Sequence, residues 1–181
     1  MIRITKTSKP SKRKNPHLED IEEFIENNSS KFKYLNKGVE GKVYYFKLNR
    51  KLMLNTEILQ PGEYVLKILH EGKKYSLDHI DQLKLFSKYG LVPKVFVVTK
   101  QYVVMKYIRG TTLKHLEKSL KQEEIWAIDN KVEKLHNIWK KLGFQSYIDP
   151  NEANVLVSDD MKHVYIIDPF LYEDIFGYPS D

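Results

Sequence analysis

Hydrophobic positions in the first hundred residues mostly follow the two-residue period of strands, with two segments of helical period. Apolar residues between 18 and 25 predict a helix that begins at Asn15-Pro16 and ends within residues 27–30. Runs rich in β-branched and aromatic residues predict strands at 32–35, 43–46, 63–69, 94–98 and 101–105. A second helix is predicted from a cap at Ser76 to Gly90, with inward-facing Leu77, Ile80, Leu83 and Phe86.

After residue 110 the strand period stops and the chain becomes mainly helical. Residues 111–118 predict a short helix. Ser119 with Gln122 makes a capping-box start for a long amphipathic helix that Gly143 closes. Two tryptophans on this helix are interpreted as packing residues, Trp126 and Trp139.

Three oxygen-bearing side chains surround a predicted hairpin near the end of the sequence. Its strands are the runs 155–157 and 164–167. Asp149 and Asn154 form a D-x-x-x-x-N pair before the first strand, and Asp168 follows the second. Carboxylate and amide oxygens suit a hard cation such as Mg²⁺, which uses few protein ligands beside phosphates. Ordinary turn acids on a surface hairpin would give the same pattern.

Two features of the strand-rich half could bind phosphate. The turn between its first two strands contains Gly38 and Gly41, which let backbone N–H groups approach an anion. In the run 63–69, alternation places Lys67 on the same face as its apolar neighbours two residues away, where it needs a partner or a ligand phosphate. Alternatively, the glycines serve only the hairpin, and Lys67 protects an edge strand against aggregation.

Composition narrows the class of protein. The chain has 181 residues, which is enough for one domain or two small lobes, and 41% of them are hydrophobic. It contains no cysteine, so disulfides and thiol chemistry are excluded, and a reducing cytoplasm is the expected location. No apolar run reaches the roughly 20 residues of a membrane span, and the start lacks the apolar core of a signal peptide.

The first 16 residues form a basic leader that contributes to the net charge of +6. Such a leader could bind nucleic acid or an acidic partner. It lacks aromatic residues that would stack on bases, and we interpret it as a solvated tail.

The ordered set of motifs resembles the protein-kinase fold. The order is a Gly-rich hairpin, a strand Lys, a helix, two strands, a hinge, a long helix, D-x-x-x-x-N, a hairpin and an Asp. Over residues 32–170 the chain looks similar to small atypical bacterial kinase-like proteins of the Ser/Thr class. The resemblance implies an α+β, two-lobed fold with a truncated, mainly helical C-lobe. Its parts would be a leader with a helix (1–30), an antiparallel-sheet N-lobe (31–106) and a minimal C-lobe (107–181).

The resemblance further implies a site for ATP between these lobes. The matching nucleotide-binding positions are Gly38, Gly41, Val43, Lys67, Met105, Lys106, Ile108 and Leu156. Met105 would guard the back of the adenine pocket, and the hinge residues after it would offer backbone groups.

The resemblance also assigns catalytic roles. Asp149 matches the catalytic base, Asn154 and Asp168 match the Mg²⁺ ligands, and Lys67 matches the residue that holds the α- and β-phosphates. A helix acid usually orients that lysine, and Asp81 is the first candidate here, with Asp78 second.

The chain departs from the kinase pattern at several positions. Asn36 replaces the first Gly, Tyr147-Ile148 replace the His-Arg before the catalytic Asp, and Asn151 replaces the catalytic-loop Lys. Few residues follow Asp168, so we expect no long activation loop and no full peptide-substrate platform.

The resemblance therefore implies an ATP- and Mg²⁺-dependent phosphotransferase, with a protein Ser or Thr as the expected but unidentified acceptor. The first alternative is a pseudokinase, a scaffold that binds nucleotide without catalysis, which the departures favour. The second is a small-molecule kinase of the aminoglycoside or choline type, although those usually carry a His where this chain has Tyr147. The third is a nucleic-acid binder that uses the basic leader.

Overall fold

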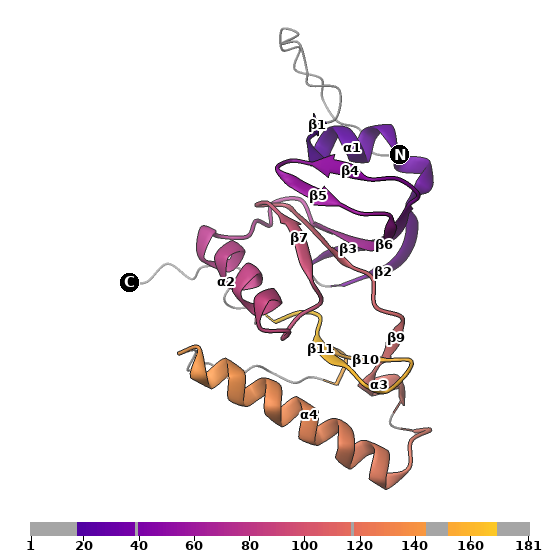
Figure 1. The fold of residues 1–181 in the computed structure, drawn as a ribbon, viewed down its shortest axis with the longest axis vertical. Coiled ribbons are helices and arrows are strands. Elements are labelled where there is room, and N and C mark those ends of the chain that lie inside the picture. The colour runs from indigo at the N-terminus through magenta and orange to yellow at the C-terminus, as the bar shows by residue number, and fades with distance from the viewer. Residues whose placement is uncertain (1–17, 39, 117, 144–151, 170–181) are drawn as a thin grey trace, which may run out of the picture.

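The structure, a computed structural model, describes residues 18–38, 40–116, 118–143 and 152–169 (Figure 1). The basic leader and Asp149 therefore lie outside the described residues. In chain order, the elements are β1 (Leu18–Glu19), α1 (Ile21–Asn27), a short 3₁₀ helix (Ser29–Lys31), β2 (Lys33–Lys37), β3 (Gly41–Leu48), β4 (Leu52–Leu54), β5 (Glu57–Leu59), β6 (Gly62–Leu69), α2 (Leu77–Lys88), β7 (Val95–Val98), β8 (Tyr102–Lys106), β9 (Gly110–Thr112), α3 (Leu113–Leu116), α4 (Gln122–Lys141), β10 (Val155–Ser158) and β11 (Val164–Ile166).

A five-stranded antiparallel sheet of order β2-β3-β6-β8-β7 forms the centre of the fold. Its longest ladder joins β3 to β6, from Gly41 opposite Leu69 to Leu48 opposite Gly62. The five runs that predicted strands before residue 110 all lie in this sheet, because β-branched and aromatic side chains pack well on a pleated, half-buried surface. The combination of helices with an antiparallel sheet agrees with the predicted fold class.

One face of this sheet is covered by a layer of which the hydrophobic pattern predicted only the helix. The layer consists of α1 and a second sheet of order β1-β4-β5, drawn above the central sheet in Figure 1. It helps to bury alternate side chains of the central sheet, including Phe46 and Leu66, which are 2% and 1% exposed. Phe24 of α1 packs against Phe46 with 5.5 Å between ring centroids.

Helix α1 begins at Ile21, so the predicted start at Asn15-Pro16 is wrong. The two residues before its cap pair with β4 as strand β1. Asp20 caps the helix because its side chain accepts a hydrogen bond from the Glu23 N–H at 2.9 Å. Strands β4 and β5 have three residues each, too few for a period to be recognised in the sequence.

The other face of the central sheet packs against α2 and the helical half of the chain. Phe86 of α2 is fully buried, and its ring centroid lies 4.5 Å from that of Trp139 on α4. Leu77 was predicted to face inward but is 69% exposed. It lies six residues before Leu83 and therefore about 120° away from it around the helix.

The segment after residue 110 contains a strand that the sequence did not predict. Thr111 and Thr112 form β9 rather than a helix, because β10 offers them backbone partners, with Thr111 opposite Val157. Gly110 permits this close approach, since a Cβ there would lie 2.1 Å from the Val157 carbonyl oxygen. Helix α3 is accordingly restricted to Leu113–Leu116.

Helix α4 begins two residues later than the predicted capping box would place it. Its N-cap is Lys121, whose N–H donates to the Glu124 carboxylate at 2.8 Å. The Ser119 hydroxyl instead donates to the Leu116 carbonyl at 2.8 Å, at the end of α3. The Glu124 side chain therefore plays its part in a capping box, but the predicted cap Ser119 belongs to the end of α3.

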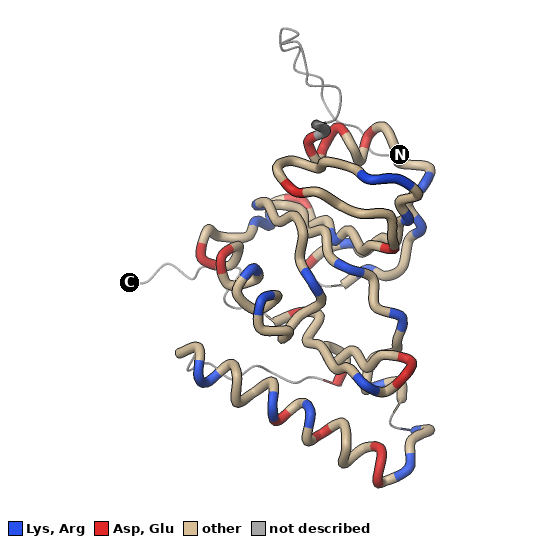
Figure 2. Tube along the Cα trace, in the orientation of Figure 1, with Lys and Arg blue, Asp and Glu red and all other residues tan. Residues whose placement is uncertain are grey.

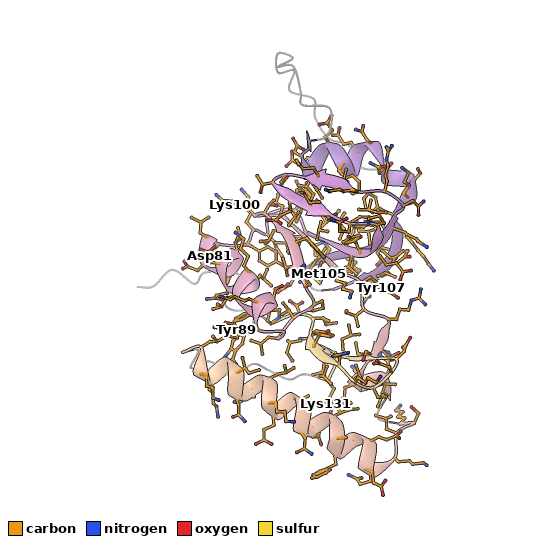
Figure 3. The ribbon with its side chains drawn as sticks, in the orientation of Figure 1. Asp81, Tyr89, Lys100, Met105, Tyr107 and Lys131 are labelled. Carbon is orange, nitrogen blue, oxygen red and sulfur yellow. The ribbon has the colours of Figure 1, made fainter. Side chains whose placement is uncertain are left out.

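The predicted hairpin forms between β10 and β11 and lies between the central sheet and α4 in Figure 1. Lys131 of α4, labelled in Figure 3, donates through Nζ to the Met161 carbonyl in the hairpin turn. Figure 2 shows acidic and basic residues interspersed along α4. Trp139 is buried as predicted, whereas Trp126 is 69% exposed. Within the described ranges, no helix combines the length and apolarity needed to cross a membrane.

Candidate functional site

Lys67 lies in the middle of β6, which is a central strand of the sheet between β3 and β8. Its cross-strand partners are Val43 on β3 and Val103 on β8. Lys67 is 8% exposed, so its ammonium group is surrounded by protein. The interpretation of Lys67 as an edge-strand residue is therefore wrong, and the predicted need for a partner applies.

Two carboxylates contact the Lys67 ammonium group. Glu40, in the turn between β2 and β3, accepts a hydrogen bond from Nζ, and its side chain is only 6% exposed. Asp168, which follows β11 after Ile167, has its Oδ1 atom 3.1 Å from Nζ, with its side chain 28% exposed. The fold thus brings three charged residues together from the turn, the central strand and the distant hairpin.

Burial and charge act in opposite directions on this cluster. Burial alone lowers the pKa of Lys67, but the acidic groups beside it, Tyr75, Asp168 and Glu40, outweigh this effect and hold that pKa above its ordinary value. Burial raises the pKa of the Glu40 carboxyl to about 7, although Lys67 opposes the rise. Burial likewise raises the pKa of the Tyr75 hydroxyl to about 12. Lys67 therefore remains a cation at neutral pH.

The turn that carries Glu40 is fastened to the end of β6. The Gly38 N–H donates to the Gly41 carbonyl at 2.9 Å, and the His70 N–H donates to the Glu40 carbonyl at 2.8 Å. A Cβ at Gly41 would lie 2.2 Å from the Ile68 carbonyl oxygen, so the sheet itself requires this glycine. The nearest atom to a Cβ at Gly38 would be 3.8 Å away, so packing does not require the first glycine.

The predicted pairing of Lys67 with a helix acid is wrong. Asp81 on α2 has an 81% exposed side chain and lies 4.0 Å from Lys84 of the same helix. Figure 3 places Asp81 at the outer side of α2, and Asp78 is also exposed. The buried residues of α2 are Leu83 and Phe86; Asp81 lies on the opposite side of the helix from Leu83, and Asp78 is exposed in the first turn. The acid beside Lys67 is instead Glu40 from the turn.

Asn154 and Asp168 lie at the open end of the β10–β11 hairpin. Val155 pairs with Ile166, and the Ile167 N–H donates to the Asn154 carbonyl at 2.9 Å. The hairpin therefore places an amide and a carboxylate on facing strand ends, as the sequence predicted. Glu152, Ala153 and the start of the hairpin are described, but Asp149 is not, so its assignment as the base stays a prediction.

The predicted adenine contacts belong to three strands. Val43, Met105 and Leu156 are half-buried apolar residues on β3, β8 and β10. Register places Val65, a neighbour of Lys67 on β6, opposite Met105. The Lys106 N–H donates to the Lys94 carbonyl at 2.8 Å, so this N–H is already used within the sheet. Ile108 follows β8 and is half-buried.

A polar network that sequence reasoning missed holds the segment after β8 against the sheet. The Glu63 carboxylate accepts from the Tyr45 hydroxyl at 2.8 Å and from the Arg109 guanidinium at 3.2 Å. Tyr107, labelled in Figure 3, packs edge-on against Tyr45 with 5.0 Å between ring centroids. The sequence offered one signal for this network, the acid Glu63 near the start of β6, the strand that pairs with β8.

We compared the chain with family models, curated proteins and solved structures, and only the solved structures gave a match. No family model and no curated protein matches the sequence. The crystal structure of the PknI kinase domain from Mycobacterium tuberculosis matches with a TM-score of 0.51 and 17% identity, covering 77% of this chain and 60% of that domain. A double mutant of that domain gives a TM-score of 0.53 and 17% identity over 83% of this chain and 63% of the domain. This chain has a protein-kinase-like fold.

The protein-kinase-like fold is shared over part of the neighbours' length. A second double mutant of the PknI kinase domain matches over 77% of this chain but only 58% of the domain, with 17% identity and a TM-score of 0.53. The chain therefore spans about three fifths of these PknI kinase domains. At this identity the likeness establishes the fold, and the chemistry must be argued from this chain's own residues.

Proposed function

We propose that this chain is an ATP- and Mg²⁺-dependent phosphotransferase that modifies a protein Ser or Thr hydroxyl. The observation that carries the proposal is the 3.1 Å contact between Lys67 and Asp168, which are 101 positions apart. A lysine between two valines on a central strand is costly to bury, and a strand with a purely structural role would be more stable with an apolar residue. A buried cation beside a carboxylate at a hairpin end suits a phosphate group and its metal ion.

The donor set fits Mg²⁺ bound together with a nucleotide. Asn154 and Asp168 would supply one amide oxygen and one carboxylate, and the phosphates would supply further oxygens, which is the usual Mg²⁺ arrangement. Bound Mg²⁺ would offset the negative charge on the phosphates. Lys67 would hold the α- and β-phosphates. Val43, Met105 and Leu156 would enclose the base, and the Lys106 carbonyl and the Ile108 backbone would hydrogen-bond to it.

Asp149 is the residue that we propose accepts the proton of the attacking hydroxyl. The protein's contribution would then be positioning and electrostatic stabilisation, the two effects that dominate phosphoryl transfer. The proposed lobes, 31–106 and 107–181, would contribute Lys67 and Asp168 from opposite sides of the nucleotide.

The test combines binding with transfer. Calorimetry of the wild-type chain with ATP and Mg²⁺ should show binding that the Asp168→Asn variant weakens by about tenfold or more. Asp159→Asn, an exposed acid in the hairpin turn, should bind like the wild type. Radiolabelled ATP with a mixture of protein acceptors should give labelled Ser or Thr, and Asp149→Ala should abolish transfer while it retains ATP affinity.

The scaffold and the small-molecule kinase each have their own outcome in this experiment. ATP binding without transfer to protein or small-molecule acceptors would indicate a nucleotide-binding scaffold. Transfer only to aminoglycosides or choline would indicate a small-molecule kinase. No binding at millimolar ATP with Mg²⁺ would refute the proposed function.

A further inference from the structure

The acid that contacts Lys67 in this chain comes from the glycine-containing turn and not from a helix. This differs from the arrangement that the motif order predicted. It matters because a phosphate-binding lysine must be held in one position to act on its ligand.

We infer that Glu40 is the positioning residue for Lys67 in the nucleotide-bound protein, in the place predicted for an acid on α2. This inference rests on the proposed function, because Lys67 needs positioning only if it binds phosphate. Glu40 itself would touch neither the base nor the transferred phosphate.

The first argument is that the backbone fixes Glu40 beside Lys67. The Glu40 carbonyl accepts the His70 N–H at 2.8 Å, and the next residue, Gly41, pairs with Leu69. His70 also contacts the Gly38 carbonyl through Nε2 at 3.1 Å. These contacts hold both sides of the turn against the end of β6, the strand that carries Lys67.

The second argument is that α2 offers no substitute. Its two acids, Asp78 and Asp81, are exposed, while Leu83 and Phe86 are buried in the core. Asp81 lies two residues before Leu83 and therefore about 160° away from it around the helix. Bringing Asp81 to Lys67 would require α2 to rotate by nearly half a turn and to expose Phe86, which is fully buried and packs against Trp139.

The third argument concerns which carboxylate remains with Lys67 when a nucleotide binds. Asp168 is the more exposed partner, with a 28% exposed side chain, and it is the proposed Mg²⁺ ligand. An ammonium group has three donors. If Asp168 turns toward the metal ion, one donor becomes available for a phosphate oxygen, while Glu40, 6% exposed, continues to hold Lys67.

The experiment measures the affinities for ATP with Mg²⁺ and for adenosine in Glu40→Gln. Glutamine preserves the shape of the side chain and removes its charge. We expect affinity for ATP to fall by about tenfold and affinity for adenosine, which lacks phosphates, to stay within twofold. A purely structural role would weaken both ligands together. Circular dichroism checks that the variant is folded.

Two matched variants complete the test. Glu71→Gln removes an exposed acid close to His70, and Asp81→Asn removes the helix acid. Both should bind ATP like the wild type. A loss of ATP affinity in Asp81→Asn would overturn the inference in favour of a moving helix.

The remaining outcomes separate the inference from the proposed function. Unchanged ATP binding by Glu40→Gln, with normal binding by the wild type, would show that Glu40 does not position Lys67, and tighter binding would show that Glu40 competes with the phosphate. Either result would overturn the inference and leave the proposed function standing. A wild-type chain that binds no ATP would overturn both.

Discussion

The buried pair of Lys67 and Glu40 should be strongly coupled in the folding energy. The perturbation is Lys67→Met, which keeps the length of the side chain and removes its charge. Glu40, with a 6% exposed side chain, would then be buried without its cation, whereas Asp168, with a 28% exposed side chain, would regain water more easily. Breaking a buried ion pair from one side typically costs about 3–5 kcal/mol.

We expect the lower end of that range for Lys67→Met, about 3 kcal/mol, because Glu40 can take up a proton when the lysine is absent. Its pKa is already raised to about 7 by burial. For a chain of this size, the loss corresponds to a fall in Tm of about 6–12 °C. The double variant Lys67→Met with Glu40→Gln should lose about 2 kcal/mol less than the sum of the two single variants, since it no longer buries an acid without its cation.

Urea unfolding followed by tryptophan fluorescence is a suitable assay. Trp139 is 4% exposed beside Phe86 and should report loss of the core, while the signal of exposed Trp126 should change little. Lys100→Met, an exposed lysine labelled in Figure 3, serves as the control and should stay within about 0.5 kcal/mol of the wild type. Additivity of the two single variants within about 0.5 kcal/mol would refute the coupling.

Two further predictions test packing with matched controls. Gly41→Ala should lower the free energy of unfolding by at least about 2 kcal/mol in urea, because its Cβ would lie 2.2 Å from the Ile68 carbonyl oxygen. Gly38→Ala, with 3.8 Å of space, should change it by less than about 1 kcal/mol, and equal losses would contradict the argument. Trp139→Ala should cost about 3–5 kcal/mol by calorimetry. Trp126→Ala should be near neutral, and a similar loss there would refute the burial argument.

The sequence was sufficient to predict the strands of the central sheet and the β10–β11 hairpin. In both, β-branched residues repeat over enough positions to define a face. The same alternation placed Lys67 among apolar residues and thereby predicted that it needs a partner. The positions of Asn154 and Asp168 at facing strand ends also follow from the hairpin alone.

Other features depended on contacts between distant segments. Strand β9 forms because Thr111 and Thr112 meet the edge of β10, and no local pattern indicates this pairing. The layer of β1, β4 and β5 uses strands of two or three residues, and the Asn55 side chain in its turn accepts the Ile21 N–H at 3.1 Å. Tertiary contacts override local propensity at such positions.

The choice of the acid beside Lys67 was open to a sharper argument from sequence. The predicted inward face of α2 already contained Leu83 and Phe86, so a helical wheel turns Asp81 away from it. The structure adds the register of β3 against β6, with Val43 opposite Lys67, which brings the turn residue Glu40 to the same end of the sheet. The helix period argues against Asp81 from sequence, whereas the choice of Glu40 needs the strand register that the structure supplies. Because Glu40 lies in a turn that is hydrogen-bonded to the end of β6, the turn and the strand that carries Lys67 form one unit. Positioning Lys67 on a bound nucleotide should therefore require no rotation of α2. The Asp81→Asn variant tests this consequence.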